Sequence, residues 1–136
     1  MAEERETIAD RLPPYARGLG IEVERIENGT PVLAMDFSER VQGRPGYLHG
    51  GALSGLLEMA AIAALQEELR RDEGATRIKP VNVTIEFMRG GTKQRTYAHG
   101  RVTRAGRRIA NVSAEAWQDD RDKPIATAFL NIALRD

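Results

Sequence analysis

The stretch from Gly51 to Leu65 constrains the fold more than any other part of this chain. It reads GALSGLLEMAAIAAL, and Glu58 is its only charged residue. A helix that is apolar on nearly all sides has to be buried on most of them, so the rest of the chain must enclose it. We expect this helix to run from about Gly51 to Arg71, where the sequence has become charged, and Gly74 suits the C-cap.

The sequence on either side of this helix predicts strands. Residues 20–25 and 31–37 read as two strands joined at Asn28-Gly29, a dipeptide that favours a hairpin turn. After the helix, four more strands are predicted at residues 81–87, 95–104, 109–118 and 125–134, with Ala105-Gly106 in a hairpin.

The remaining segments are short. Residues 3–16 are expected to form a helix that ends or bends at Pro13-Pro14, and residues 40–48 a loop rich in Gly and Pro. The order of elements predicts an α+β fold, in which an antiparallel sheet wraps around one long central helix.

Length and composition limit the classes of protein to consider. With 136 residues, we expect a single domain over residues 1–136. The chain has no cysteine, and two histidines, His49 and His99, are too few for a convincing metal cluster, so no cofactor is expected. The charged start lacks the apolar core of a signal peptide, and no segment holds the roughly 20 apolar residues that span a bilayer. We therefore expect a cytoplasmic protein.

The charge of the chain is balanced in total but uneven along the sequence. Its 20 basic and 20 acidic residues give a formal net charge of zero, so neither nucleic acid nor an anionic membrane is expected as the main partner. Between Met88 and Ala114, however, there are seven basic residues and no acidic one. This run is either a solvated sheet surface or a docking surface for a phosphorylated carrier, since Arg pairs bidentately with phosphate.

Candidate chemistry lies at the start of the predicted helix, where His49-Gly50-Gly51 is followed at a distance by Glu58. Free N–H groups of the two glycines at a helix N-terminus can bind developing negative charge. A lone carboxylate among apolar residues is costly to bury unless it is paired, hydrogen-bonded or protonated, and such isolation is one way to make a base. Together these groups indicate acyl transfer or hydrolysis.

Three segments of the chain resemble the hotdog-fold acyl-CoA thioesterases, in particular the phenylacetate-pathway (PaaI-like) group. They are GYLHGGALSGLLEMA (Gly46 to Ala60), VNVTIEFMR (Val81 to Arg89) and VTRAGRRIANVSAEAW (Val102 to Trp117), and the similarity runs from about Leu19 to the end. The resemblance implies a hotdog fold and hydrolysis of an acyl-CoA to a free acid and CoA.

The resemblance also implies roles for single residues. Glu58 would activate water as a base or attack the thioester carbonyl as a nucleophile, and the Gly50 N–H would polarise the thioester oxygen. His49 is expected to orient the loop rather than to transfer protons. The Asn or Gln that the family often has six residues before this histidine corresponds to Gly43 here, with Gln42 one residue away.

Substrate binding is expected to involve residues of the strands and their hairpin. The resemblance implies that Arg107 and Arg108 lie near the CoA phosphates. Where the family commonly has an Arg-Pro pair after its strand, this chain has Arg89-Gly90-Gly91, so the local turn should differ. Asn82 and Thr84 would either help to position water or substrate or make a polar subunit contact.

A geometric argument predicts a homodimer. Gly50 and Glu58 are eight residues apart, so they lie about 12 Å apart along a helix and cannot both contact one thioester carbonyl. Two antiparallel helices across a two-fold axis would bring Gly50 of one chain near Glu58 of the other, which is also the family's arrangement. The exposed edges of a sheet wrapped around one helix point to the same pairing, and we expect a dimer of dimers.

Other functions stay open at this point. A non-catalytic acyl-CoA-binding or sensing protein would use the same pocket, and only the retained Glu58 argues against it. An enoyl-CoA hydratase of the same fold usually needs a loop Asp beside a His, and no Asp lies between Phe37 and Arg71. Ser54 is not in a G-x-S-x-G elbow, and His99 has no expected role. The sequence is compatible with aryl, short or medium acyl groups, carried by CoA or by an acyl carrier protein.

Overall fold

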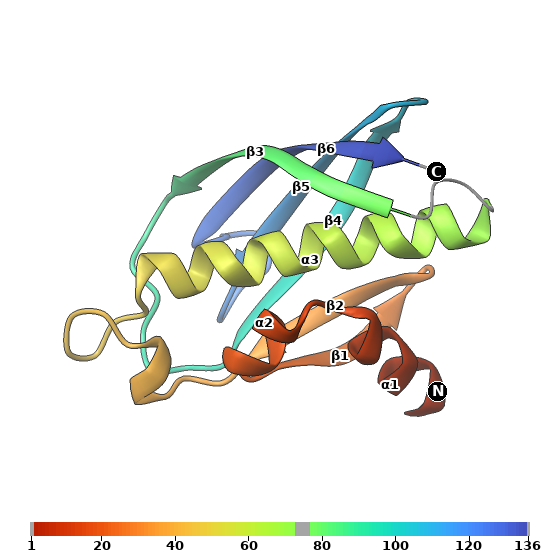
Figure 1. The fold of residues 1–136 in the computed structure, drawn as a ribbon. Coiled ribbons are helices and arrows are strands. Elements are labelled where there is room, and N and C mark those ends of the chain that lie inside the picture. The colour runs from red at the N-terminus through yellow and green to blue at the C-terminus, as the bar shows by residue number, and fades with distance from the viewer. Residues whose placement is uncertain (1, 73–76, 136) are drawn as a thin grey trace.

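The computed structural model describes residues 2–72 and 77–135 (Figure 1). A long helix, α3 (Gly50–Arg71), lies against a sheet whose strands come from both sides of it in the sequence. The strands are β1 (Ile21–Glu27), β2 (Thr30–Met35), β3 (Arg77–Phe87), β4 (Thr96–Ala105), β5 (Ile109–Trp117) and β6 (Ala126–Arg135). The helices α1 (Ala2–Arg11) and α2 (Pro14–Gly18) precede the sheet, and a short 3-10 helix, η1 (Glu39–Val41), precedes α3.

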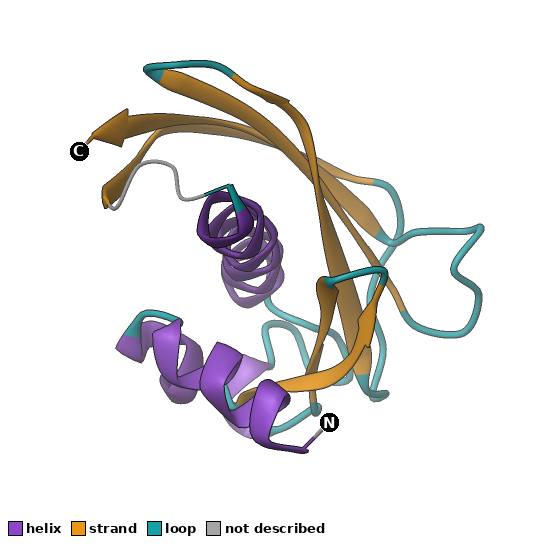
Figure 2. Cartoon of the chain, turned by 90° about the vertical axis from the view of Figure 1, so that its right-hand side faces the viewer, coloured by secondary structure: helices purple, strands orange, loops and turns teal. Residues whose placement is uncertain are grey.

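The sheet is antiparallel and curved. Its six strands are ordered β1-β2-β4-β5-β6-β3, and each neighbouring pair is antiparallel. The sheet bends around α3, which lies in its hollow (Figure 2). The side that faces α3 is termed the concave face below, and the opposite side the convex face. The predicted α+β arrangement, an antiparallel sheet around one long central helix, is confirmed.

Helix α3 is buried as its sequence predicts. Between Ala52 and Leu65, every apolar side chain of α3 is at most 6% exposed. A Cβ atom at Gly100 of β4 would collide with the carbonyl of Ala60, so this glycine lets the helix lie close to the sheet. Within the described ranges, no helix is long and apolar enough to cross a membrane.

The hairpin between β1 and β2 forms where the sequence predicts it. Asn28 and Gly29 have φ angles of 49° and 81°, and Glu27 pairs with Thr30 across the turn. Two successive positive φ angles are the mark of a type I′ turn, whose twist matches that of the flanking strands. Asn and Gly adopt such angles at low cost.

Strand β3 is an exposed edge of the sheet. It pairs with β6 on one side, and no described strand pairs with the other. Val81, Val83 and Phe87 are 58%, 44% and 57% exposed. Val83 and Phe87 lie opposite the buried Leu130 and Ala126 of β6, so they belong to the concave face, where α3 leaves them largely exposed. An exposed apolar edge strand of this kind can pair with a strand of another chain.

Some boundaries differ from those expected. The helix predicted over residues 3–16 is two helices, because the helical conformation is interrupted before Pro13 and resumes in α2. Pro14 is the first residue of α2, where a backbone N–H would have no partner within the helix, so its absence costs nothing. Strand β3 begins at Arg77 rather than Val81, and the register shifts between Pro80 and Asn82. A proline is compatible with an edge strand at such an irregularity.

Two further predictions concern the ends of α3. The loop over residues 40–48 is not wholly irregular, because it contains η1 and a bridge between Gln42 and Leu48. The C-terminal end of α3 at Arg71 is confirmed, with Asp72 at the cap position. The expected C-cap at Gly74 lies outside the described residues.

Candidate active site

The loop that leads into α3 is held by its own hydrogen bonds. The side-chain oxygen of Gln42 accepts the N–H of Gly46 at 2.8 Å. The N–H of His49 donates to the carbonyl of Val41 at 2.8 Å. These bonds fix the turn from which α3 starts, and they use the Gln42 oxygen within the loop.

His49 is the N-cap of α3. Its Nδ1 accepts the N–H of Gly51 at 2.9 Å, so the ring takes the place of the Ser, Thr, Asp or Asn that usually caps a helix. A nitrogen that accepts a hydrogen bond carries no proton, which leaves the proton of the neutral ring on Nε2. This contact agrees with the loop-orienting role expected of His49, and it uses the N–H of Gly51.

Gly50 is left with a free backbone donor. Within the residues that the structure describes, its N–H has no hydrogen-bond acceptor, and the residue is exposed at the positive end of α3. The ring of Phe87, at the end of β3, is 3.5 Å from the position of a Cβ atom at Gly50. Gly50 is therefore an exposed residue that lies beside an aromatic ring.

Glu58 lies two turns further along α3. Its side chain is half-buried and forms no hydrogen bond or ion pair within residues 2–72 and 77–135. The expectation of a carboxylate enclosed by apolar neighbours is therefore not met within one chain, where Glu58 keeps contact with solvent. Ser54, one turn before it, donates to the carbonyl of Gly50 at 2.8 Å and is thus engaged with the helix backbone.

The buried carboxylate of α3 is Glu67 instead. Its residue is 3% exposed and accepts hydrogen bonds from Arg11 of α1 at 2.6 Å and from Arg70 at 2.9 Å. From the sequence, Glu67 is only one of several charged residues near the end of the helix, and nothing in it predicts this contact. Its partner Arg11 is 56 residues away along the chain, so no local pattern could have indicated the pair.

Asn82 and Thr84 lie on the convex face, across the sheet from Gly50 and Glu58. Asn82 pairs with Asn131 of β6, whose side chain donates to the Asn82 oxygen at 2.9 Å. The Asn131 oxygen in turn accepts from Asn111 of β5 at 2.6 Å. Within one chain, then, Asn82 belongs to a row of amides and is separated from the α3 residues by the sheet.

The seven basic residues between Met88 and Ala114 do not form one continuous surface. Arg95 is bound to Glu22, Glu24 and Asp36 at 3.0, 2.9 and 2.7 Å. In contrast, Arg107 and Arg108 are exposed in the turn between β4 and β5, where the Arg108 carbonyl accepts the N–H of Leu134. These two arginines are placed where a phosphate could reach them.

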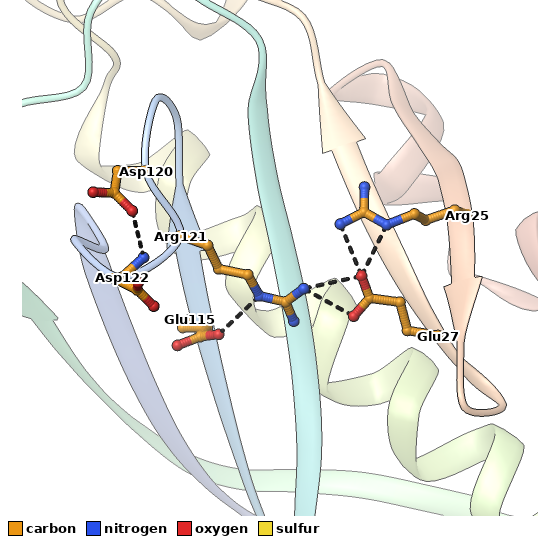
Figure 3. A network of polar contacts seen from close by, with 6 residues as sticks. All are labelled: Arg25, Glu27, Glu115, Asp120, Arg121 and Asp122. Carbon is orange, nitrogen blue, oxygen red and sulfur yellow. Dashed lines mark hydrogen bonds and ion pairs between the residues drawn. The ribbon is translucent and has the colours of Figure 1, made fainter.

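A polar cluster on the convex face was not predicted (Figure 3). Arg121, from the turn before β6, donates to Glu27 at 2.8 Å and to Glu115 at 3.4 Å, and its guanidinium lies 4.4 Å from the centre of the Trp117 ring. The hydrogen bond from Arg121 is the main reason why the pKa of Glu27 is lowered. Residues from both ends of the sequence meet here, so the cluster joins the β1–β2 hairpin to the rest of the sheet.

His99 lies on the same face, at β4. Its Nε2 is buried and has no hydrogen-bond partner. Burial lowers the pKa of His99, and the nearby positive charge of Arg121 lowers it further. His99 is therefore held in its neutral form, and the sheet separates it from α3 and the candidate active site.

The chemistry available to these residues is limited. Among the described residues, no group of three or more His, Asp or Glu side chains could hold a metal ion. Helix α3 offers an N–H donor at Gly50, at its N-terminus, and a carboxylate at Glu58, two turns further along, and neither group has a partner among the described residues. Such a pair suits the addition of water to a carbonyl carbon.

Comparison with known families agrees with this chemistry. The family model of the thioesterase superfamily matches residues 45–125, more than half of the chain, including the His49-Gly50-Gly51 turn and Glu58. Among curated proteins, the medium/long-chain acyl-CoA thioesterase YigI of Salmonella typhimurium is 27% identical over 119 residues, which cover 79% of this chain and 77% of the relative.

Solved structures show the same fold. A protein from Chromobacterium violaceum is 32% identical, with a TM-score of 0.73, covering 99% of this chain and 92% of its own. A protein from Ralstonia eutropha, described as related to phenylacetic acid degradation, is 21% identical with a TM-score of 0.79 and covers 95% of this chain and 97% of its own. The hotdog fold expected from the sequence is thereby confirmed.

Proposed function

Because the chain belongs to the thioesterase superfamily, and is thus a thioester hydrolase, we propose that it hydrolyses acyl-CoA to a free carboxylic acid and CoA. The observation that carries the proposal is the N–H of Gly50 at the N-terminus of α3, which has no acceptor among the described residues. As the thioester carbonyl is attacked, its oxygen becomes negative and accepts this N–H. One such donor is worth roughly 3 kcal/mol of transition-state stabilisation.

Glu58 supplies the second group in this proposal. In the general-base route, it takes a proton from water while the water oxygen bonds to the carbonyl carbon. The C–S bond then breaks, and the sulfur leaves as a thiolate that takes up a proton. In the alternative route, a Glu58 oxygen bonds to the carbon, the thiolate leaves, and water hydrolyses the resulting anhydride. Both routes end in the same acid and thiol.

The two groups meet across a dimer in this proposal. Within one helix they are about 12 Å apart, too far for one carbonyl oxygen and its attacking water. The exposed apolar edge of β3, with Val81, Val83 and Phe87, supports pairing with a second copy, so that two α3 helices lie antiparallel. Gly50 of one chain and Glu58 of the other then form each of two sites. A dimer of dimers, in the cytoplasm, completes the assembly that we propose.

Other residues are assigned to binding. Arg107 and Arg108, exposed in the β4–β5 turn, would hold the CoA phosphates. Gln42 and His49 keep the loop in shape through their bonds to Gly46 and Gly51. Asn82 and Thr84, on the convex face of the edge strand β3, would make a polar contact with the partner subunit rather than with the substrate at α3. No metal or redox cofactor enters the proposed reaction.

A thiol-release assay against aryl-, short-, medium- and long-chain acyl-CoA tests the proposal. The medium/long-chain relative makes those chain lengths the first to try. We expect Glu58→Gln to lower kcat at least 100-fold while the protein stays folded and still binds a non-hydrolysable acyl-CoA. Glu68→Gln is the matched control, since Glu68 is a half-buried carboxylate of the same helix without a side-chain partner among the described residues.

Equal hydrolysis by Glu58→Gln and wild type would contradict the role of Glu58. A wild-type protein that binds acyl-CoA but hydrolyses none of the panel would be a sensor rather than an enzyme. Hydration of crotonyl-CoA without thiol release would identify a hydratase.

A further inference from the structure

Several basic side chains lie on the convex face of the sheet, and four of them form no ion pair with a described residue. Arg101 of β4 lies opposite Ser113, and Arg104 lies opposite Asn111. Arg135 of β6 follows the buried Leu134 and therefore points to the other face, and Lys79 of β3 pairs with Ala133 on that same face. These four residues (Lys79, Arg101, Arg104 and Arg135) are termed the basic face.

The positive charge of the basic face is not neutralised by any described residue of the chain. All four side chains are exposed, and none forms an ion pair with a described residue. At the other end of the convex face, Arg121 is bound to Glu27 and Glu115. Arg107 and Arg108, at the adjoining turn, add two more exposed cations. The zero net charge of the chain thus hides a segregated positive surface.

Two large apolar side chains are exposed among these cations. Phe129 of β6 lies opposite Ser113 and is 55% exposed, and Ile109 of β5 lies opposite Ala133 and is 43% exposed. Together with the basic face they form a surface that is positive and partly apolar. This is the composition of surfaces that rest in the headgroup layer of an anionic membrane.

We propose that the basic face docks on an anionic lipid bilayer. An anionic bilayer offers negative charge over a broad area and also admits apolar side chains between its headgroups, which matches both features of this surface. The four cations of the basic face come from three strands and form no ion pair with a described residue, so they suit mobile headgroups better than the fixed charges of a folded partner. Two such faces meeting would repel each other, which argues against a second copy as the occupant.

This inference goes beyond the proposed hydrolysis and does not depend on it. The sheet separates the basic face from Gly50 and Glu58, so docking leaves the candidate active site uncovered. If two chains pair along β3, their convex faces form one continuous surface, and both basic faces can contact the same bilayer.

Cosedimentation with lipid vesicles tests the proposal. We expect binding to vesicles of phosphatidylcholine mixed with an equal part of phosphatidylglycerol, little binding to phosphatidylcholine alone, and release by salt. Each basic side chain near an anionic surface contributes a factor of roughly five, so Arg101→Gln with Arg104→Gln should weaken binding roughly 25-fold. Phe129→Ser should weaken it several-fold.

Matched controls separate the basic face from general charge and general exposure. Arg17→Gln with Arg40→Gln removes two exposed arginines of α2 and η1, outside the sheet, that form no ion pair with a described residue. Tyr15→Ser removes a side chain on α2 that is 52% exposed, close to the value for Phe129. Both controls should bind vesicles as the wild type does.

Three outcomes would overturn the proposal. The first is equal binding to neutral and anionic vesicles, or no binding to either. The second is an equal loss of binding in the basic-face and control variants. The third is a change in oligomeric state of the Arg101→Gln, Arg104→Gln protein, measured by light scattering, because it would show that the face joins copies of the chain.

Discussion

At the scale of single residues, the proposed site depends on one backbone N–H, that of Gly50. A proline at this position would remove the N–H while the helix stays intact. Proline is favoured at the first position of a helix, and the residue before it has to be extended. His49 has φ −70° and ψ 132°, which meets this requirement. Gly50→Pro should therefore fold normally, yet lower kcat about 100- to 1000-fold through loss of the oxyanion donor.

Gly50→Ala is the control for this change. It retains the N–H, and its Cβ would meet the Phe87 ring at 3.5 Å, an ordinary contact. We expect most of the activity to remain. Equal activity in the Pro and wild-type proteins, measured by thiol release, would show that this N–H does not act in the reaction.

His99 makes a separate prediction about pH. Its pKa is lowered in the folded protein from an ordinary value of 6.5, chiefly by burial. As the pH falls through about 6.5, the unfolded chain therefore binds a proton that the folded protein resists, and the free energy of unfolding decreases. In His99→Phe this decrease should be smaller. Urea unfolding of both proteins at several pH values measures it, and parallel pH curves would contradict the assignment.

At the scale of elements, α1 is tied to α3 by Glu67. Its carboxylate accepts from Arg11 and from Arg70, and Glu67→Gln would remove the charge that both arginines neutralise. We expect the free energy of unfolding to fall by about 1–3 kcal/mol and α1 to become the first site of proteolysis. Glu68→Gln should leave both measurements unchanged. A similar decrease in the free energy of unfolding in the two variants would show that the contacts of Glu67 do not attach α1 to α3.

The elements that the sequence predicts well are those with local signals. The apolar run fixes α3, and Asn28-Gly29 fixes the first hairpin, because each pattern determines its own structure within a few residues. The predicted start of β3, at Val81, lies after the observed start at Arg77, because Pro80 interrupts the alternation of apolar and polar residues where the register shifts. The contacts of Glu67, His99 and Arg121 were missed, because their partners are distant in sequence and become neighbours only in the folded sheet.

In the candidate site too, the sequence predicts what depends on local spacing and does not predict individual side-chain contacts. His49, Gly50 and Glu58 are spaced along one helix, so their relative positions follow from its geometry. The use of the Gly51 N–H by the His49 ring, and of the Gln42 oxygen by the loop, depends on side-chain rotamers. No residue pattern specifies those.

At the scale of the whole molecule, the proposed reaction requires two chains, and mixing two inactive variants tests this directly. Glu58→Gln and Gly50→Pro would each disable both sites of a homodimer. A mixed dimer, however, contains one site with Gly50 from the first chain and Glu58 from the second, and that site is intact. Random reassociation from denaturant should make half of the dimers mixed and so recover about a quarter of the wild-type activity in the thiol-release assay. If each chain instead carried a complete site, the mixture would stay as inactive as its two components.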